Sequence, residues 1–424
     1  MCGIVGFVNY KQNLLNYKKI LQNMNNSLSK RGPDEEGYYL KEHVGLAHRR
    51  LIVIDPIGGK QPMISSKTEK KHSEIVITYN GQIYNTNELR KTLEENGFTF
   101  TSYSDTEVLL KSYIFYGKDV VHHLNGIFSF AIWDSEKEEL FMARDHFGVK
   151  PLFYTMQNNS FIFASEIKTL FQYPGIQKIL DSQGVSELFG IGPAHTPGTT
   201  VFNNIFELKP AHFAVFNRSG FHFEKYWKLK SEPHTENFEQ TCEHLEFLLK
   251  DAITRQLVSD VPLCTFLSGG LDSSIITKYA SDYCFENNLP PLDTYSIDYV
   301  DNDKNFVKSD FQPNSDNYYI NLMINKLHTL HHPIVIDTPE LAEYLEDAMR
   351  LNRNMRGFKL LRALYLFEKG EKLEAKADEL EEKTGKCYDD YRQAACFLRC
   401  DADMAEDEYR ELQNQKKLIK TQNK

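Results

Sequence analysis

The chain has 424 residues, enough for about two to four domains at roughly 100 to 200 residues each. Its composition is that of an ordinary globular protein, because 41% of the residues are hydrophobic and 25% are charged, which excludes disordered and fibrous classes. The 49 basic and 59 acidic side chains give a net charge of −10, which argues against a nucleic-acid partner or a broad anionic-membrane surface.

The first part of the chain, residues 1 to about 215, is rich in short apolar or alternating runs bounded by Gly, Asp, Asn or Lys. These runs predict strands at Ile4–Val8, Ile75–Tyr79, Ile127–Trp133, Leu140–Ala143 and Phe161–Ala164. Leu21, Met24 and Leu28 recur at helical spacing, and Glu88–Asn96 predicts a short helix that stops at Gly97. The pattern therefore predicts an α+β domain in which strands predominate.

A polar stretch with Pro233, between Tyr226 and Asn237, is the best linker candidate, so we expect a second domain from residue 238. The order of elements after it is helix, apolar strand, glycine turn, helix and strand. The corresponding segments are Thr241–Val258, Val261–Leu267, Ser268–Gly270, Asp272–Cys284 and Thr294–Tyr299. This order predicts the start of a parallel α/β sheet.

Residues 350–424 differ again in composition, since they hold no His, Trp or Pro and are dense in Glu, Lys, Ala and Leu. Apolar residues there step by three or four, which predicts an all-helical tail. The predicted organisation is a first domain over residues 1–225, a second over 238–349 and a tail of unknown role over 350–424.

Cys2 is a candidate nucleophile if Met1 is removed, since one residue then carries a thiol and a free α-amino group. An α-amino group with a pKa of ~7.7 to 8.0 can act as general base for that thiol at neutral pH. The dipeptide alone leaves a second interpretation open, in which Cys2 is a small buried residue that begins a strand.

Six motifs then follow in order along the first domain. They are Cys2-Gly-Ile-Val-Gly6, Arg31-Gly-Pro-Asp34, Ala47-His-Arg-Arg-Leu51, Tyr79-Asn-Gly-Gln-Ile-Tyr-Asn85, Ser104-Asp-Thr-Glu107 and Arg144-Asp-His-Phe-Gly-Val-Lys-Pro-Leu152. Together they resemble the glutamine amidotransferase domain of asparagine synthetases, an N-terminal-nucleophile fold of two stacked antiparallel sheets with helices. In that family Cys2 would cleave the glutamine side-chain amide through a glutamyl thioester.

The resemblance also implies a set of glutamine-binding residues. It comprises Arg50, Leu51, Ile52, Val53, Asn80, Gly81, Gln82 and Asp105. Arg50 would bind the substrate α-carboxylate with a two-pronged guanidinium, and Asp105 would bind the α-ammonium. Asn80 and the Gly81 N–H would form the oxyanion hole. Gln82 departs from the Glu usual in the family, so we expect weaker glutamine binding and a site that is still active.

A second signal is Leu267-Ser-Gly-Gly-Leu-Asp-Ser-Ser274, placed between a predicted strand and a helix. Backbone N–H groups, serine hydroxyls and the helix N-terminus in such a turn suit phosphate oxygens. It resembles the pyrophosphate loop of ATP pyrophosphatases, which implies Ser268, Gly269, Gly270, Asp272 and Ser273 around the phosphates of ATP. The same resemblance places Asp272 near Mg²⁺, and Leu267 and Ile297 against the nucleotide.

A glutaminase followed by an ATP pyrophosphatase resembles the glutamine-hydrolysing asparagine synthetases. The implied reaction uses glutamine, aspartate and ATP, with ammonia from the first site attacking an aspartyl-adenylate. We expect a cytoplasmic enzyme with no nucleic-acid or membrane partner, because no run approaches the roughly 18 to 20 apolar residues of a membrane span and no leader opens the chain. A homodimer is left open.

The resemblance stops near Met349. The family's second Ser-Gly-Glu-x-x-Asp-Glu segment, which completes its nucleotide site, does not occur between residues 350 and 424. Two functions therefore stay open: an asparagine-synthetase-like amidotransferase, or a glutaminase-only or regulatory protein with a vestigial synthetase domain and a partner-binding helical tail.

Overall fold

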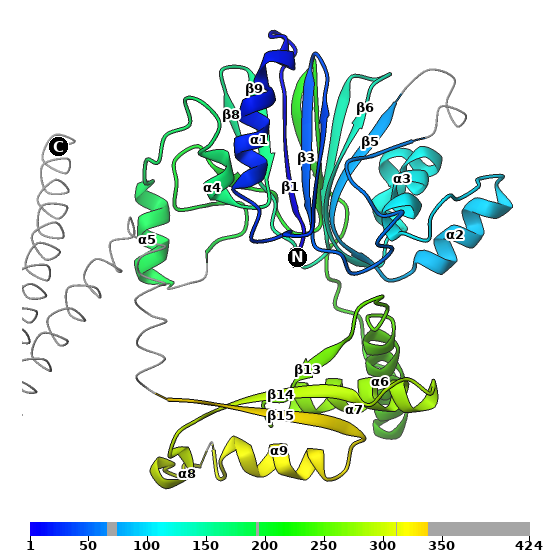
Figure 1. The fold of residues 1–424 in the computed structure, drawn as a ribbon, viewed down its shortest axis with the longest axis vertical. Coiled ribbons are helices and arrows are strands. Elements are labelled where there is room, and N and C mark those ends of the chain that lie inside the picture. The colour runs from blue at the N-terminus through cyan, green and yellow to red at the C-terminus, as the bar shows by residue number, and fades with distance from the viewer. Residues whose placement is uncertain (66–73, 192–194, 311, 338–424) are drawn as a thin grey trace, which may run out of the picture. The chain divides into compact units, whose positions relative to one another are not determined.

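A computed structural model describes residues 1–65, 74–191, 195–310 and 312–337 of the chain (Figure 1). The chain divides into two compact units. The first comprises Met1–Leu263 with Asp282–Asn287, and the second comprises Cys264–Ser281 and the chain from Asn288 onwards. The predicted helical tail lies outside the described residues.

Two six-stranded antiparallel sheets form the centre of the first unit. One has the order β10-β8-β9-β1-β3-β2, with β1 (Gly3–Val8), β2 (Glu35–Leu40), β3 (Val44–Arg50), β8 (Phe153–Gln157), β9 (Ser160–Ala164) and β10 (Phe206–Glu207). The other has the order β12-β11-β7-β6-β5-β4, with β4 (Met63–Ile64), β5 (Ile75–Ile83), β6 (Gly126–Asp134), β7 (Glu139–Arg144), β11 (His212–Asn217) and β12 (Gly220–Lys225).

Helices cover the outer faces of both sheets (Figure 1). The helices of this unit are α1 (Lys18–Asn26), α2 (Thr86–Glu95), α3 (Asp105–Tyr116), α4 (Ile167–Leu170), α5 (Ser182–Gly190), α6 (Phe238–Thr254) and the 3-10 helices η1 (Leu14–Tyr17) and η2 (Gly117–His122). Leu21 and Met24 of α1 pack on the β1 sheet, while Leu109 of α3 packs on the β5 sheet. The unit is thus a helix-sheet-sheet-helix sandwich.

The strand alternation of β1 builds two of these layers at once. Val5 and Phe7 point to the α1 side, whereas Ile4 and Val8 join the layer between the sheets. Gly6 also has to be small, because a Cβ there would lie 2.6 Å from the ring of Phe163 and 2.7 Å from the carbonyl oxygen of Gly45. Burial on both faces therefore fixes β1 in place at the centre of its sheet.

The second unit contains a three-stranded parallel sheet of order β13-β14-β15. Its elements are β13 (Cys264–Phe266), α7 (Leu271–Glu286), β14 (Leu292–Tyr299), α8 (Asn302–Asn305), α9 (Asp316–Ile324) and β15 (Thr329–Ile336). The end of α7 is counted with the first unit. Among the described residues, none of the helices combines the length and the apolar character that a membrane crossing requires.

The α+β sandwich and the parallel sheet are confirmed, and so are all five predicted strands of the first part. Strand β5 continues to Ile83, beyond the predicted end at Tyr79, because pairing of Gly81 with Phe128 extends the ladder through a polar segment that reads as a loop. Helix α6 begins earlier than predicted, at Phe238, because Asn237 and Gln240 form a reciprocal capping box. The domain boundaries drawn from the sequence stay predictions.

Gly6→Ala should destabilise the first unit by about 1 to 3 kcal/mol, because the added methyl overpacks the layer between the sheets. Urea unfolding followed by tryptophan fluorescence reports on this unit, since Trp133 and Trp227 both lie in it. Gly190→Ala is the matched control, because a Cβ there meets nothing within 4 Å. An unchanged urea midpoint for Gly6→Ala would mean that the layer between the sheets accommodates the added methyl group without a loss of stability.

Candidate active site

Cys2 lies immediately before β1, which is paired with β3 on one side and β9 on the other. The Leu51 N–H donates to the Cys2 sulfur at 3.4 Å, and the thiol donates to the Leu51 carbonyl at 3.6 Å. The Arg31 Nε donates to the Cys2 carbonyl at 2.9 Å, which gives a positioning role to a residue that the sequence offered only as part of a motif. Strand pairing and these bonds hold the thiol at the end of the sheet.

The charge states at this end of β1 are set mainly by burial. Burial raises the pKa of the Cys2 thiol above its ordinary value, although the hydrogen bond with Leu51 acts in the opposite direction. Burial also lowers the pKa of the Met1 α-ammonium. The thiol is therefore protonated at neutral pH, while an amine in this setting gives up its proton more readily.

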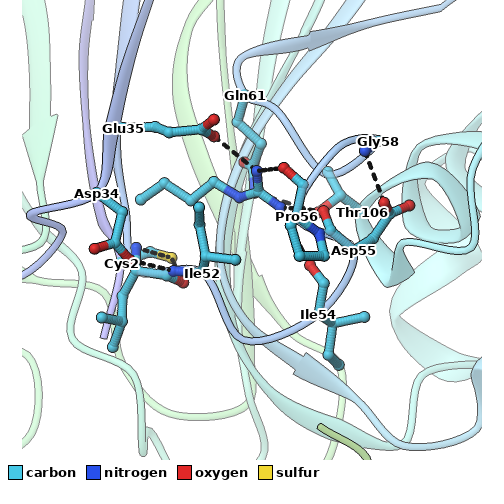
Figure 2. A network of polar contacts seen from close by, with 12 residues as sticks. Cys2, Asp34, Glu35, Ile52, Ile54, Asp55, Pro56, Gly58, Gln61 and Thr106 are labelled. Atoms are coloured by element: carbon cyan, nitrogen blue, oxygen red, sulfur yellow. Dashed lines mark hydrogen bonds and ion pairs between the residues drawn. The ribbon is translucent and has the colours of Figure 1, made fainter. Parts of the chain in front are cut away.

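A cavity of about 170 Å³ opens beside Cys2. Its walls include most of the residues predicted to bind glutamine: Arg50, Leu51, Val53, Asn80, Gly81, Gln82 and Asp105. Ile52 is the one member of the predicted set that does not line it, and its backbone N–H instead donates to the Asp34 carboxylate at 2.8 Å (Figure 2).

Asn80 and Gly81 reach the cavity from β5. Asn80 is 2% exposed, and its side-chain nitrogen has no hydrogen-bond partner among the described residues. A buried donor without a partner is costly unless something else accepts from it. Gly81 approaches β6 so closely that a Cβ would lie 2.2 Å from the carbonyl oxygen of Ile127. Asn80 can therefore donate to a developing negative charge inside the cavity.

Asp105 is the first residue of α3 and is largely buried. Its carboxylate accepts from the Tyr79 hydroxyl at 2.8 Å and from the Ile83 N–H at 3.2 Å. Burial raises the pKa of Asp105 in spite of these bonds. A cation in the cavity would favour the charged form of this carboxyl group, which makes Asp105 a fitting counter-charge for an ammonium.

Arg50 was predicted to bind a substrate α-carboxylate with its two-pronged guanidinium, and both of its terminal nitrogens already donate to other groups in the structure. One donates to the Glu35 carboxylate at 2.7 Å and to the Pro56 carbonyl at 3.1 Å. The other donates to the carbonyls of Ile54 at 3.1 Å and Asp55 at 2.5 Å (Figure 2). These bonds take four of the five guanidinium donors, so Arg50 shapes the adjoining loop as well as lining the cavity.

Lys150 is a cavity residue that sequence reasoning missed. It is 8% exposed, and its ammonium lies 3.3 Å from the Met1 sulfur. The Asp145 carboxylate accepts from the Lys150 N–H at 3.0 Å, and the Arg144 Nε donates to the Lys150 carbonyl at 2.7 Å. These bonds fix the loop from Arg144 to Leu152, which places the Lys150 ammonium in the wall of the cavity that Cys2 also lines. The sequence motif that contains Lys150 was the signal that could have identified this residue.

The predicted phosphate-binding residues lie together in the second unit. Leu267 is 1% exposed and its N–H donates to the Tyr295 carbonyl at 2.8 Å. The Ser268 and Ser273 hydroxyls are 3.0 Å apart, and Asp272 lies in the first turn of α7. Gly269 has a φ of +82°, which a side chain would strain. Serine hydroxyls, glycine N–H groups and a helix N-terminus fit phosphate oxygens.

The structure gives less support to the nucleotide and metal contacts that were predicted around this loop. Ile297 of β14 is 56% exposed. No group of three or more His, Cys, Asp or Glu side chains converges among the residues that the structure describes. Asp272 is therefore a single carboxylate beside a phosphate-type loop, a donor set that fits a cation shared with phosphate oxygens.

Comparisons with known proteins match both parts of the chain to known families. Residues 1–227 match the glutamine amidotransferase domain family, and residues 244–368 match the asparagine synthase family. The chain is 48% identical over 349 residues to the glutamine-hydrolysing asparagine synthetase 3 of Bacillus subtilis, covering 82% of this chain and 56% of that relative. It is 32% identical over 364 residues to a putative glutamine-hydrolysing asparagine synthetase 2 of Methanocaldococcus jannaschii, covering 82% and 67% respectively.

Among solved structures, the glutamine phosphoribosylpyrophosphate amidotransferase of B. subtilis aligns with a TM-score of 0.40 and 15% identity over 79% of this chain and 81% of that one. The chain spans 56%, 46% and 39% of the lengths of the three B. subtilis asparagine synthetases that it matches, or about half.

Alkylation of Cys2 with iodoacetamide should be slow at pH 7 in chains that keep Met1, and it should rise about tenfold per pH unit to beyond pH 9.0, because burial raises the thiol pKa. Peptide mapping separates chains with and without Met1 by mass, and the exposed Cys242 is the internal control. An alkylation rate of Cys2 that levels off near pH 7 in peptides that keep Met1 would contradict a raised thiol pKa.

Proposed function

The chain belongs to the family of glutamine-hydrolysing asparagine synthetases, and we propose that its first unit hydrolyses glutamine at Cys2 to supply ammonia for asparagine synthesis. The observation that supports this most is the buried, unpartnered Asn80 side-chain nitrogen in the wall of the cavity that Cys2 adjoins. Such an arrangement suits acyl transfer, in which a nucleophile and a donor face the same carbonyl carbon.

Catalysis begins once Met1 is removed, because the α-amino group of Cys2 is then free to take the thiol proton. The thiolate attacks the carboxamide carbon of glutamine, and the negative charge moves to the amide oxygen. The Asn80 side chain and the Gly81 N–H stabilise that oxygen; losing one such donor typically costs ~2.7 to 4 kcal/mol of barrier. The α-ammonium returns its proton to the leaving nitrogen, the C–N bond breaks, and ammonia departs from a thioester.

Water then completes the cycle. The free α-amino group of Cys2 takes a proton from the attacking water, the C–S bond breaks, and glutamate leaves with the thiol restored. A base needs its neutral form at the working pH, and an α-amino group with a pKa of ~7.7 to 8.0 has a neutral fraction there.

Two charged residues orient the substrate in this proposal. Asp105 pairs with the α-ammonium, which suits its buried position at the cavity wall. Arg50 binds the α-carboxylate, and since four of its donors already serve Glu35 and the loop carbonyls, the substrate competes with Glu35 for this guanidinium. Glu35 therefore sets how readily Arg50 accepts a substrate carboxylate.

In the second unit, we propose that the Ser268–Ser273 turn binds the phosphates of ATP. The aspartate side-chain carboxylate attacks the α-phosphorus, pyrophosphate leaves, and ammonia replaces AMP on the resulting acyl-adenylate. Mg²⁺, held at Asp272, would neutralise phosphate charge. The match of residues 244–368 to the asparagine synthase family supports this assignment.

A second candidate function is glutamine hydrolysis without asparagine synthesis. It needs only the first unit, in which Cys2 and the unpartnered Asn80 nitrogen adjoin the same cavity. Binding of ATP at the Ser268–Ser273 turn can then persist without turnover, because adenylate formation depends on charge stabilisation in the transition state.

The full chain should release glutamate from glutamine, and Cys2→Ala should abolish release while leaving the fold intact, because only the thiolate forms the thioester. Glutamate and asparagine are measured with and without ATP and aspartate, and with ammonium chloride in place of glutamine. Asparagine at ~1 per second or more supports the synthetase; glutamate alone supports the second candidate. Glutamate release by Cys2→Ala would contradict the nucleophile assignment.

Glu35→Gln should lower the glutamine KM several-fold, because it frees the Arg50 guanidinium from its carboxylate partner at 2.7 Å. Arg50→Lys should raise the same KM sharply, since a point charge replaces a planar two-pronged donor. Steady-state rates of glutamate release give the glutamine KM of each variant. A raised KM for Glu35→Gln would show that Glu35 instead orients Arg50 toward the substrate.

A further inference from the structure

A short segment that follows α6, Arg255–Asp260, contacts the walls of the cavity from outside, within the first unit. Its last residue makes three bonds. The Asp260 N–H donates to the Val53 carbonyl at 2.9 Å. The Asp260 carboxylate accepts from the Asp55 N–H at 2.7 Å and from the Tyr103 hydroxyl at 2.8 Å, both at the same oxygen.

These bonds act on the loop Leu51–Gly59, which we term the glutamine loop. Val53, Ile54 and Gly59 of this loop line the cavity. Asp55 has a φ of +50°, a left-handed conformation that costs a non-glycine residue free energy. Such a conformation persists only where its surroundings hold it.

Asp55 is held on several sides. Its carboxylate accepts from the N–H groups of Gly58 at 2.7 Å and Tyr103 at 3.0 Å. Its carbonyl accepts from Arg50 on the cavity side. Asp260 completes the set by binding the Asp55 N–H. The strained residue thus connects Arg50, on the cavity side, to Asp260, on the outer side.

The same segment also reaches β5 and α2. The Gln82 side-chain nitrogen donates to the Val258 carbonyl at 2.9 Å, a bond that a glutamate carboxylate lacks the proton to make. Arg255 forms an ion pair with Glu88 at 2.7 Å. The departure at Gln82 noted in the sequence therefore has a partner in this chain.

We propose that Asp260 is a positioning residue for glutamine hydrolysis, which holds the glutamine loop in its binding shape through Asp55, Val53 and Tyr103. The inference rests on the proposed function, because it assigns the loop to glutamine binding. It concerns substrate affinity more than chemistry, since Asp260 touches the loop and neither Cys2 nor Asn80 belongs to its contacts. Loss of the bonds from Asp260 to the glutamine loop should therefore raise the glutamine KM and leave kcat nearly unchanged.

The test uses the full chain with three single variants, one double variant and a control. Asp260→Ala removes both acceptor bonds and should raise the glutamine KM about tenfold. Asp260→Asn keeps an oxygen that accepts from Asp55 and Tyr103, and should restore most of the affinity. Tyr103→Phe removes one bond and should raise KM about two- to threefold, with no additional effect in the Asp260→Ala background. Asp303→Ala removes an exposed carboxylate of α8 and should change neither constant.

Hydrogen exchange of peptides that cover residues 51–59 gives a readout that does not need turnover. Exchange there should increase in Asp260→Ala and return toward the wild-type rate in Asp260→Asn. An unchanged KM and unchanged exchange in Asp260→Ala would overturn the inference, and so would a loss of kcat alone. If the wild-type chain releases no glutamate, the proposed function fails, and the exchange result alone then decides whether Asp260 holds the loop.

Discussion

The register of β1 is the constraint on which the rest of the site depends. Gly3 pairs with Arg49 of β3, so Cys2 lies level with Arg50 and its sulfur meets the backbone of Leu51. Because successive strand residues point to opposite faces, a slip of one residue would turn the thiol away from the cavity. Pairing on both edges and the tight packing of Gly6 prevent that slip. The core between the sheets therefore also sets the direction of the Cys2 thiol.

Burial gives the site its chemistry. It keeps the Cys2 thiol protonated until a base removes the proton, it raises the pKa of Asp105, and it leaves the Asn80 side chain without an acceptor among the described residues. Burial of the Asp105 carboxylate and of the unpartnered Asn80 nitrogen is unfavourable in the free protein, and it becomes favourable when a substrate supplies an ammonium or an oxyanion. The Glu35 carboxylate, in contrast, already pairs with Arg50, so in the proposed mechanism a substrate carboxylate would have to displace it.

Much of this could be predicted from the sequence. The parts that could not be predicted have a physical cause in common. Short apolar runs predicted β1, β6 and β7, because alternation is a local signal. The polar end of β5 was missed, since its ladder is fixed by β6 and not by its own residues. The partners of Arg50 and the contacts of Asp260 were missed for the same reason. Asp260 is separated from Asp55 by 205 residues, and no local sequence pattern predicts a contact over that distance.

The most direct test of the central claim is to label the protein with a diazoketone analogue of glutamine, which alkylates a thiolate at the position of the amide carbon. Peptide mapping should find one adduct, on Cys2 of chains that have lost Met1, and an excess of glutamine should suppress it. An adduct on another cysteine, or equal labelling of chains that keep Met1, would contradict the account.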